Sequence, residues 1–241
     1  MFGFKMKFNR LEIIFALLYL KYIKHSKIQK ICSEKWHGSD YGGWVICPEN
    51  LSKTSIIYSF GVGEDTSWDE ELIAEYGVKV FGFDPTPKSA TYVQKRNLHN
   101  FTFFQIGVAD HDGLFKFYPP KNSSHVSCSI FKQQDLQDEP ILVKMMTLDA
   151  IMKQLGHEKI DILKMDIEGA EYGVIEDIIK KSIFPQQILV EFHHRFSPFS
   201  IADTKRAIRD LIHNGYEVFY ISNNYQEFSL IHRVFNTERG E

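Results

Sequence analysis

The chain has 241 residues, 44% of them hydrophobic, which is enough to bury the core of one α/β domain with a short extension. Its formal net charge is −3 with both signs mixed along the chain, which argues against a nucleic-acid partner because such proteins carry a basic face. The three cysteines, Cys32, Cys47 and Cys128, lack the spacing of a metal site. Their odd number is typical of reduced thiols in a cytoplasmic protein, so we expect them to be packing residues.

Residues 1–35 predict a helical extension that precedes the main domain at 36–241. Its apolar run, Leu11–Leu20, is interrupted by Glu12 and is shorter than the roughly 20 residues that span a bilayer. Basic residues flank the run on both sides: Lys5, Lys7, Arg10, Lys21, Lys24, Lys27 and Lys30. No small-residue cleavage site follows, as a signal peptide requires. We interpret the extension as an amphipathic helix that covers the core or a partner subunit of a homo-oligomer. The alternative is a basic helix that lies on a membrane surface.

Residues 36–44 are rich in glycine and aromatic side chains, with Trp36 and Trp44 at the two ends. One interpretation is a surface loop anchored by the two tryptophans. The other is a lid or wall over a ligand site, because loops often carry recognition.

The pattern typical of a nucleotide site begins directly afterwards. The apolar run Ile56–Phe60 predicts a buried parallel strand that enters a tight turn at Gly61 and Gly63, where glycine permits positive φ and close approach of a ligand. A second apolar run, Val78–Phe83, ends in Asp84 about twenty residues later, where a carboxylate can accept hydrogen bonds from both hydroxyls of an adenosine ribose.

The charges at the glycine turn indicate which nucleotide binds. The motif of a dinucleotide-binding site has a third glycine at the position that Thr66 occupies in this chain. Glu64 and Asp65 would also repel a pyrophosphate, although anions otherwise favour helix N-termini. These carboxylates suit a ligand with a cationic centre and an ammonium group, such as S-adenosylmethionine.

Two helix starts and a third strand follow from local signals. Ser67 and Glu70 form a capping-box pattern, and Thr86 followed by Pro87 marks a second helix start. Residues 101–108 predict a third strand, after which Asp110 either meets the adenine base or is a plain turn acid.

Acidic and histidine residues gather where two later strands end. The buried strand predicted at 160–165 leads into Asp166, Glu168 and Glu171, and three carboxylates at one strand-to-helix junction are costly unless they bind something. The strand predicted at 187–192 leads into Glu191, His193 and His194. Ligands of open α/β sheets bind outside the carboxyl ends of strands, so we expect both groups at one edge. Apolar runs at 217–221 and 228–233 predict a closing antiparallel hairpin.

With these motifs in place, the chain resembles the FkbM-type S-adenosylmethionine-dependent methyltransferases over roughly residues 41–233. The motifs that carry the resemblance are Ser59–Asp65, Phe83–Pro87, Thr147–Asp149 and, most specifically, Leu163–Glu171. The resemblance implies the class I methyltransferase fold, a Rossmann-like α/β sheet of seven mostly parallel strands with an antiparallel C-terminal hairpin. It also implies methylation of a hydroxyl, often on a sugar or polyketide product. The chain departs from the family pattern at two positions: the family has an acid where Ser59 stands and a third glycine where Asp65 stands. The resemblance therefore implies that Glu64 or Asp65 binds the ammonium group of the cofactor's methionine.

The predicted site joins a cofactor half to a catalytic half. The residues expected to bind S-adenosylmethionine are Gly61, Gly63, Glu64, Asp84, Asp110 and Asp166. A sugar hydroxyl is a poor nucleophile, so we expect His193 as general base, oriented by Asp166 or Glu191. In the competing hypothesis Asp166, Glu191 and His193 hold Mg²⁺ or Mn²⁺, which also suits a metal-dependent O-methyltransferase of a non-sugar small molecule. A catalytically silent cofactor-binding module is the alternative from another class.

Overall fold

The computed structural model describes residues 10–26, 32–119, 139–195 and 198–235. The main strands are β3 (Ile56–Phe60), β4 (Lys79–Phe83), β5 (Phe101–Phe104), β9 (Ile162–Met165), β10 (Gln187–Glu191), β11 (Tyr216–Ile221) and β12 (Glu227–His232). The helices are α1 (Arg10–Ser26), α2 (Ser67–Tyr76), α3 (Pro87–Gln94), α4 (Leu148–Leu155), α5 (Glu171–Lys180) and α6 (Ile201–His213), and a 3₁₀ turn follows at Arg233–Phe235.

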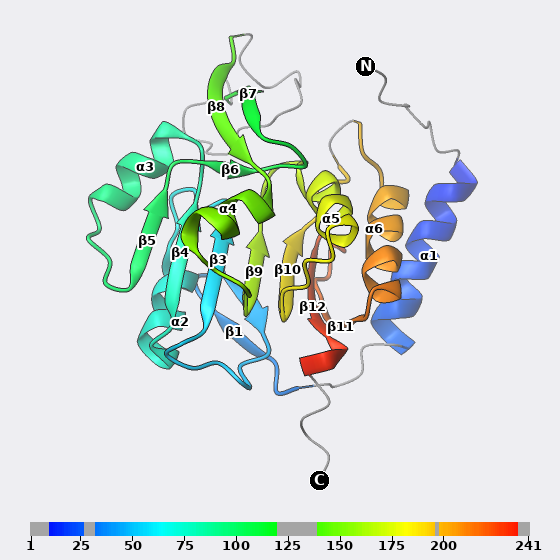
Figure 1. The fold of residues 1–241 in the computed structure, drawn as a ribbon. Helices are drawn as coiled ribbons and strands as arrows, with labels where there is room; N and C mark the ends of the chain where they lie inside the picture. Colours follow the sequence, from blue (N-terminus) through cyan, green and yellow to red (C-terminus); the bar gives the residue numbers. More distant parts are fainter. Residues whose placement is uncertain (1–9, 27–31, 120–138, 196–197, 236–241) are drawn as a thin grey trace.

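Among these residues, the seven main strands form one sheet in the order β11-β12-β10-β9-β3-β4-β5 (Figure 1). The five strands from β10 to β5 are parallel, whereas β12 runs antiparallel to both β10 and β11. The expected α/β fold with a reversed C-terminal hairpin is therefore confirmed. The order reverses beside β3, and such a switch point is where open α/β sheets bind ligands.

Side chains of the buried strands alternate between two packing layers, because successive residues of a strand point to opposite faces. Tyr58 and Phe60 of β3 pack in the layer of α4, α5 and α6, whereas Ile57 packs with α2 and the hairpin strand β2 (Trp44–Ile46). Figure 1 shows α4 and α5 in front of the sheet. Both faces are thus covered, which explains the continuous apolar runs of the sequence.

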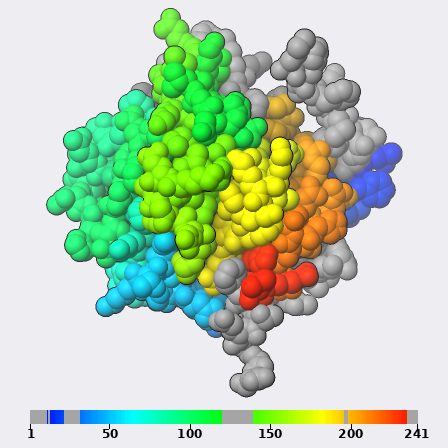
Figure 2. All heavy atoms as spheres, viewed as in Figure 1, coloured from blue at the N-terminus to red at the C-terminus, as the bar shows by residue number. Residues whose placement is uncertain are grey.

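Two small sheets flank the main one. Strand β1 (Lys35–His37) pairs with β2, and β6 (Gly107–Val108), β8 (Ile141–Met146) and β7 (Gly113–Phe117) form a second sheet. Figure 2 shows β7 and β8 standing out above the face made by α4 and α5. The third strand predicted at 101–108 is therefore divided into two strands. β5 ends at Phe104, and a turn follows in which the Ile106 nitrogen donates to the Phe104 carbonyl (2.8 Å). The next residues, Gly107 and Val108, form β6 and pair with β8 in the small sheet.

One of the two predicted helix starts is confirmed. The Thr86 side chain caps α3 by accepting from the Ser89 nitrogen (3.4 Å). The capping box predicted at Ser67 is wrong. The Asp65 carboxylate already accepts from the Ser67 nitrogen (2.8 Å), and α2 begins at Ser67 itself, one residue earlier than a helix capped by Ser67 would begin. Thr66 is the N-cap, and its hydroxyl donates to Glu70 (2.6 Å).

The N-terminal helix α1 lies against α6 at the outside of the molecule (Figure 1). Its Ala16 and Leu20 are fully buried and join the core layer of α6. Within the described ranges, no helix combines the length and apolar character that crossing a membrane requires. Cys32 and Cys47 are buried free thiols, as predicted, and Cys128 lies outside the described residues.

The hairpin of β1 and β2 is fixed to the main sheet by buried polar contacts. The Gln187 side chain, fully buried at the start of β10, accepts from the Cys47 nitrogen (2.9 Å) and donates to the Cys47 carbonyl (2.7 Å). The Ser229 hydroxyl of β12 donates to the Val45 carbonyl (2.8 Å). These contacts hold the hairpin against the sheet, and with it Trp44.

We expect Gln187→Leu to lower the free energy of unfolding by about 2–3 kcal/mol, because the buried N–H and C=O of Cys47 lose their partners. Urea denaturation of both variants measures this. Gln186→Leu is the matched control: Gln186 is also buried, and its side-chain nitrogen has no hydrogen-bond partner, so this variant should keep or gain stability. Equal losses in the two variants would contradict the assignment.

Candidate active site

A cavity of about 410 Å³ opens at the carboxyl ends of β3, β4, β9 and β10. Its size is within the range of small-ligand sites. The segments that follow these four strands line it, together with the turn between β11 and β12. Residues 41–44 also line it, so the glycine-rich segment 36–44 forms a wall of the site, as one of the two interpretations predicted. We call residues 36–44 the wall segment.

The two glycines of the predicted turn have different roles. Gly61 has φ +80°, and a Cβ there would lie 1.8 Å from the Asp166 carbonyl oxygen, so its packing against the β9 end excludes any side chain. Gly63 has φ +57° and nothing within 4 Å of a Cβ position, so it leaves open space inside the cavity. Its nitrogen donates to Asp84 (3.0 Å).

Asp84 lies at the end of β4 as predicted, and it is 94% buried. Its Oδ1 accepts from the Thr86 nitrogen (2.9 Å) and hydroxyl (2.6 Å), and its Oδ2 accepts from the Gly63 nitrogen. A carboxylate has about four acceptor sites, so these contacts orient the side chain and leave capacity for a ligand hydroxyl.

The two acids of the glycine turn both line the cavity, but their contacts differ. Asp65 accepts from the Ser39 hydroxyl (2.6 Å) and the Ser67 nitrogen, and so joins the wall segment to the start of α2. Burial alone would raise the pKa of Asp65, but these hydrogen bonds outweigh it and lower the pKa. Glu64 makes an ion pair with Lys88 (2.8 Å) at the rim. Asp65 is therefore held in place by more contacts within the protein than Glu64 is.

The structure places Asp110 outside the cavity. Its side chain is exposed and contacts the His111 ring (2.7 Å), the arrangement of a turn acid. The reason is the early end of β5: the chain reaches the cavity with Gly107 and Val108 and has left it by Asp110.

Lys164 is a cavity residue that we did not predict. It stands inside the otherwise apolar strand β9, is 6% exposed, and donates to the Gly61 carbonyl (2.8 Å). Its ammonium lies 5.7 Å from the centre of the Trp44 ring. A charge within a buried strand is the signal that would have identified it, because buried lysines need partners.

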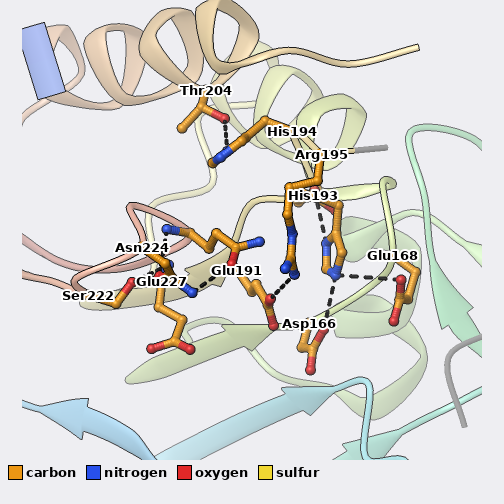
Figure 3. Close-up of polar contacts among 12 residues, drawn as sticks. Asp166, Glu168, Glu191, His193, His194, Arg195, Thr204, Ser222, Asn224 and Glu227 are labelled. Carbon is orange, nitrogen blue, oxygen red and sulfur yellow. Dashed lines mark hydrogen bonds and ion pairs between the residues drawn. The ribbon is translucent and has the colours of Figure 1, made fainter. Parts of the chain in front are cut away.

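His193 lies beyond the end of β10, surrounded by carboxylates (Figure 3). Its backbone nitrogen donates to Glu171 (2.7 Å), and its Nδ1 lies 3.3 Å from the same oxygen. On the other side of the ring, Nε2 lies 3.6 Å from Asp166 and 3.5 Å from Glu168. We expected Asp166 or Glu191 to orient His193. Asp166 lies beside Nε2, whereas Nδ1 is held by Glu171, which the first turn of α5 brings next to the ring.

The charge states of this cluster follow from its geometry. Burial alone would lower the pKa of His193, but the hydrogen bond with Glu171 and the charges of Glu171, Glu168 and Asp166 raise it to about 10. Burial, followed by the charge of Asp166, raises the pKa of Glu191 to about 8. Burial and the nearby Arg195 lower the pKa of His194 to about 4. At neutral pH His193 therefore holds a proton that His194 lacks.

His194 takes no part in the acidic cluster. Its Nδ1 lies 3.1 Å from the Thr204 hydroxyl on α6, on the side away from Asp166 (Figure 3).

The turn that carries the acids after β9 is strained in its backbone, since Glu168 has φ +52°. A non-glycine residue in this region costs about 1–3 kcal/mol, and such strain is concentrated at functional sites.

Carboxylates dominate the cavity lining: Glu64, Asp65, Asp84, Asp166, Glu168, Glu191 and Glu227. The cationic side chains of the lining are Lys164, His193 and Arg195. This excess favours a cationic ligand. Asp166, Glu191 and His193 also offer ligand atoms within 4.8 Å of one another, a grouping that could hold a metal ion. Metal-binding histidines usually donate their other N–H to a carboxylate, which is the place that Glu171 occupies.

Two curated relatives of the chain are named as a probable methyltransferase-like protein and a 2-O-methyltransferase. The chain is 25% identical to the probable methyltransferase-like protein 24 of Rattus norvegicus over 175 residues, covering 68% of this chain and 42% of that protein. It is 28% identical to the 2-O-methyltransferase NoeI of Sinorhizobium fredii (strain NBRC 101917 / NGR234) over 135 residues, covering 50% of this chain and 56% of that protein. The chain thus spans about half the length of the relatives that it matches.

Solved methyltransferases show a distant likeness. Methyltransferase FkbM from Methylobacillus flagellatus KT aligns with a TM-score of 0.48 at 12% identity, covering 76% of this chain and 44% of that one. A putative methyltransferase from Streptococcus mutans, solved in complex with SAH, aligns with a TM-score of 0.39 at 12% identity. The alignment covers 75% of this chain and 88% of that one.

The match to a family model is more extensive. The methyltransferase FkbM domain matches residues 41–218, which include residues 41–44 of the wall segment, the glycine turn, Asp84 and the acidic cluster around His193. The chain therefore belongs to the FkbM methyltransferase family.

Proposed function

We propose that this protein is an S-adenosylmethionine-dependent O-methyltransferase whose acceptor is a hydroxyl group of a sugar or glycan. The observation that carries the proposal is the acid-rich cavity at the carboxyl edge of the sheet, with the glycine turn and Asp84 on one side and the His193 cluster on the other. The name of one relative, a 2-O-methyltransferase, supports a hydroxyl acceptor.

The residues on the glycine-turn side fit the cofactor. Gly63 leaves room in the cavity, Asp84 keeps acceptor capacity for a ribose hydroxyl, and carboxylates attract the cationic sulfonium and ammonium. When bound, S-adenosylmethionine supplies a methyl carbon already activated by its sulfonium. The chain therefore has to align the acceptor oxygen and remove its proton.

The opposite wall of the cavity suits an acceptor with several hydroxyl groups. Asp166, Glu168, Glu191 and Glu227 present carboxyl oxygens to the cavity, and these can accept hydrogen bonds from the hydroxyl groups of a polyol. The same charges disfavour phosphorylated or carboxylated acceptors. Tyr41, 80% exposed at the cavity, adds an aromatic surface to this side. A neutral sugar therefore fits better than an acidic one.

Proton removal is better explained by a metal site than by His193 as a free base. With a pKa near 10, His193 is already protonated at neutral pH and has no lone pair to accept the hydroxyl proton. Asp166, Glu191 and His193 would instead hold a divalent cation, which displaces the Nε2 proton to solvent because a ligating histidine is neutral, while Glu171 orients the imidazole through Nδ1. Such a cation lowers the pKa of a hydroxyl. Two carboxylates with one imidazole suit Mn²⁺ better than Mg²⁺.

A silent cofactor-binding module is less consistent with this geometry. Glu171 and His193 are almost completely buried, and Glu168 sits in a strained conformation. Buried charges and strain both lower stability. A domain that only binds a partner gains nothing from them, whereas a catalytic site requires charged groups in fixed positions.

The activity is tested by incubating the protein with S-adenosylmethionine and Mn²⁺ and measuring release of S-adenosylhomocysteine with a panel of glycans. We expect release with a neutral sugar and a product heavier by one methylene, with the methyl group on oxygen. The deoxy sugar that lacks the methylated hydroxyl is the matched control. Methylation of nitrogen, or of a non-sugar acceptor only, would contradict the proposed acceptor.

The cofactor site is tested by calorimetry with S-adenosylhomocysteine. Asp84→Ala should weaken binding by about 1.5–3 kcal/mol, because a charged acceptor of hydrogen bonds is lost. Asp110→Ala is the control and should leave binding unchanged, since Asp110 lies outside the cavity. NAD should not bind. Unchanged affinity in the Asp84 variant would remove this residue from the cofactor site.

The catalytic cluster is tested with EDTA and with His193→Ala. We expect EDTA to abolish turnover and Mn²⁺ to restore it, while His193→Ala lowers turnover by roughly 10²–10⁴-fold. Binding of S-adenosylhomocysteine should change little in this variant, because His193 faces the acceptor side. His194→Ala, the matched control, should stay active. Activity that survives EDTA, needs His193 and rises steadily towards pH 10 would assign His193 as the base.

A further inference from the structure

The outer face of α1 carries an unpartnered apolar stripe. Leu11, Ile14, Phe15 and Leu18 are 63%, 50%, 60% and 55% exposed. Their spacing, i, i+3, i+4 and i+7, places them on one side of the helix. Leu17, 43% exposed, lies beside them. Large exposed apolar patches of this kind mark sites of interaction.

The opposite face of α1 is bound to the domain. Ala16 and Leu20 are fully buried, and Ile13 and Tyr19 pack against the same core layer. The Lys205 ammonium of α6 lies 5.2 Å from the centre of the Tyr19 ring. The helix is thus held on α6 by one apolar face and exposes a second, which is not what a helix that only covers the core requires.

The charges around this helix identify the partner. Residues 1–30 contain seven Lys or Arg and one acid, Glu12, for a net charge of +6. The whole chain has −3, so the remaining residues carry −9. The described part of this segment includes Lys21, which is exposed on α1. An exposed apolar face on a helix of a basic segment is the pattern of helices that lie in the membrane interface.

We propose that α1 docks the protein on an anionic lipid bilayer surface, with Leu11, Ile14, Phe15 and Leu18 inserted among the acyl chains and the basic residues at the headgroups. Anionic lipid attracts each nearby Lys or Arg. A second copy of the chain is a worse partner, because pairing the same face would bring two segments of charge +6 together. The geometry also leaves the cavity accessible, since none of its lining residues belongs to α1.

The proposal is tested by sedimentation of the full chain with phosphatidylcholine vesicles that contain phosphatidylserine. We expect binding that falls at least tenfold when phosphatidylserine is omitted and weakens as the salt concentration rises. Phe15→Asp with Leu18→Asp should lower binding to the anionic vesicles at least tenfold. The matched control is the double variant Leu114→Asp with Leu142→Asp, which changes two leucines of β7 and β8 that are 71% and 65% exposed. This control should bind the anionic vesicles as tightly as the unsubstituted chain does.

All variants alter exposed side chains, and equal circular dichroism spectra and melting temperatures establish that they are folded. Equal binding to vesicles with and without phosphatidylserine, or binding that both double variants retain, would overturn the proposal. A dimer that dissociates in Phe15→Asp with Leu18→Asp, measured by analytical ultracentrifugation, would overturn it too and assign the stripe to a second copy. The test does not depend on methyl transfer, so it stands or falls separately from the proposed activity.

Discussion

The buried carboxylate of Glu171 is the contact on which the catalytic edge depends. It accepts from the Gly169 nitrogen at the turn after β9 and from the His193 nitrogen after β10, and it touches the His193 ring. One side chain therefore holds together two chain segments that carry the acids and the imidazole. Because a buried carboxylate needs hydrogen-bond donors, Glu171 favours a proton on Nδ1 of His193, which leaves Nε2 facing Asp166 and Glu168.

The opposite side of the cavity is assembled from contacts between segments far apart in the chain. Gln187 fixes the β2 strand, Asp65 holds Ser39 of the wall segment, and Lys164 reaches the Gly61 carbonyl under Trp44. The wall is thus fastened at several points to the rigid sheet, which suits a site that must align two reactants.

Charge is distributed unevenly over the molecule, and this matters for both proposals. The cavity lining is acidic, which favours a cationic cofactor, a divalent cation and neutral acceptors. The N-terminal segment is basic and carries the exposed stripe of α1. The two regions therefore suit the two different kinds of partner that we propose: small cationic ligands at the carboxyl edge of the sheet, and anionic lipid at the exposed stripe of α1.

The sequence by itself determined the strand, glycine turn, helix, strand and Asp84, the confirmed cap at Thr86, and the position of Asp166 and His193 at one edge. These follow from periodicity and turn signals within a few residues, and from the rule that parallel strands end at a common edge. Only the tertiary structure decided that Glu171 orients His193, that Lys164 enters the cavity and that Asp110 leaves it. Such contacts depend on how whole elements pack, for example on where β5 ends, because side chains distant in sequence compete for the same few ångströms of space.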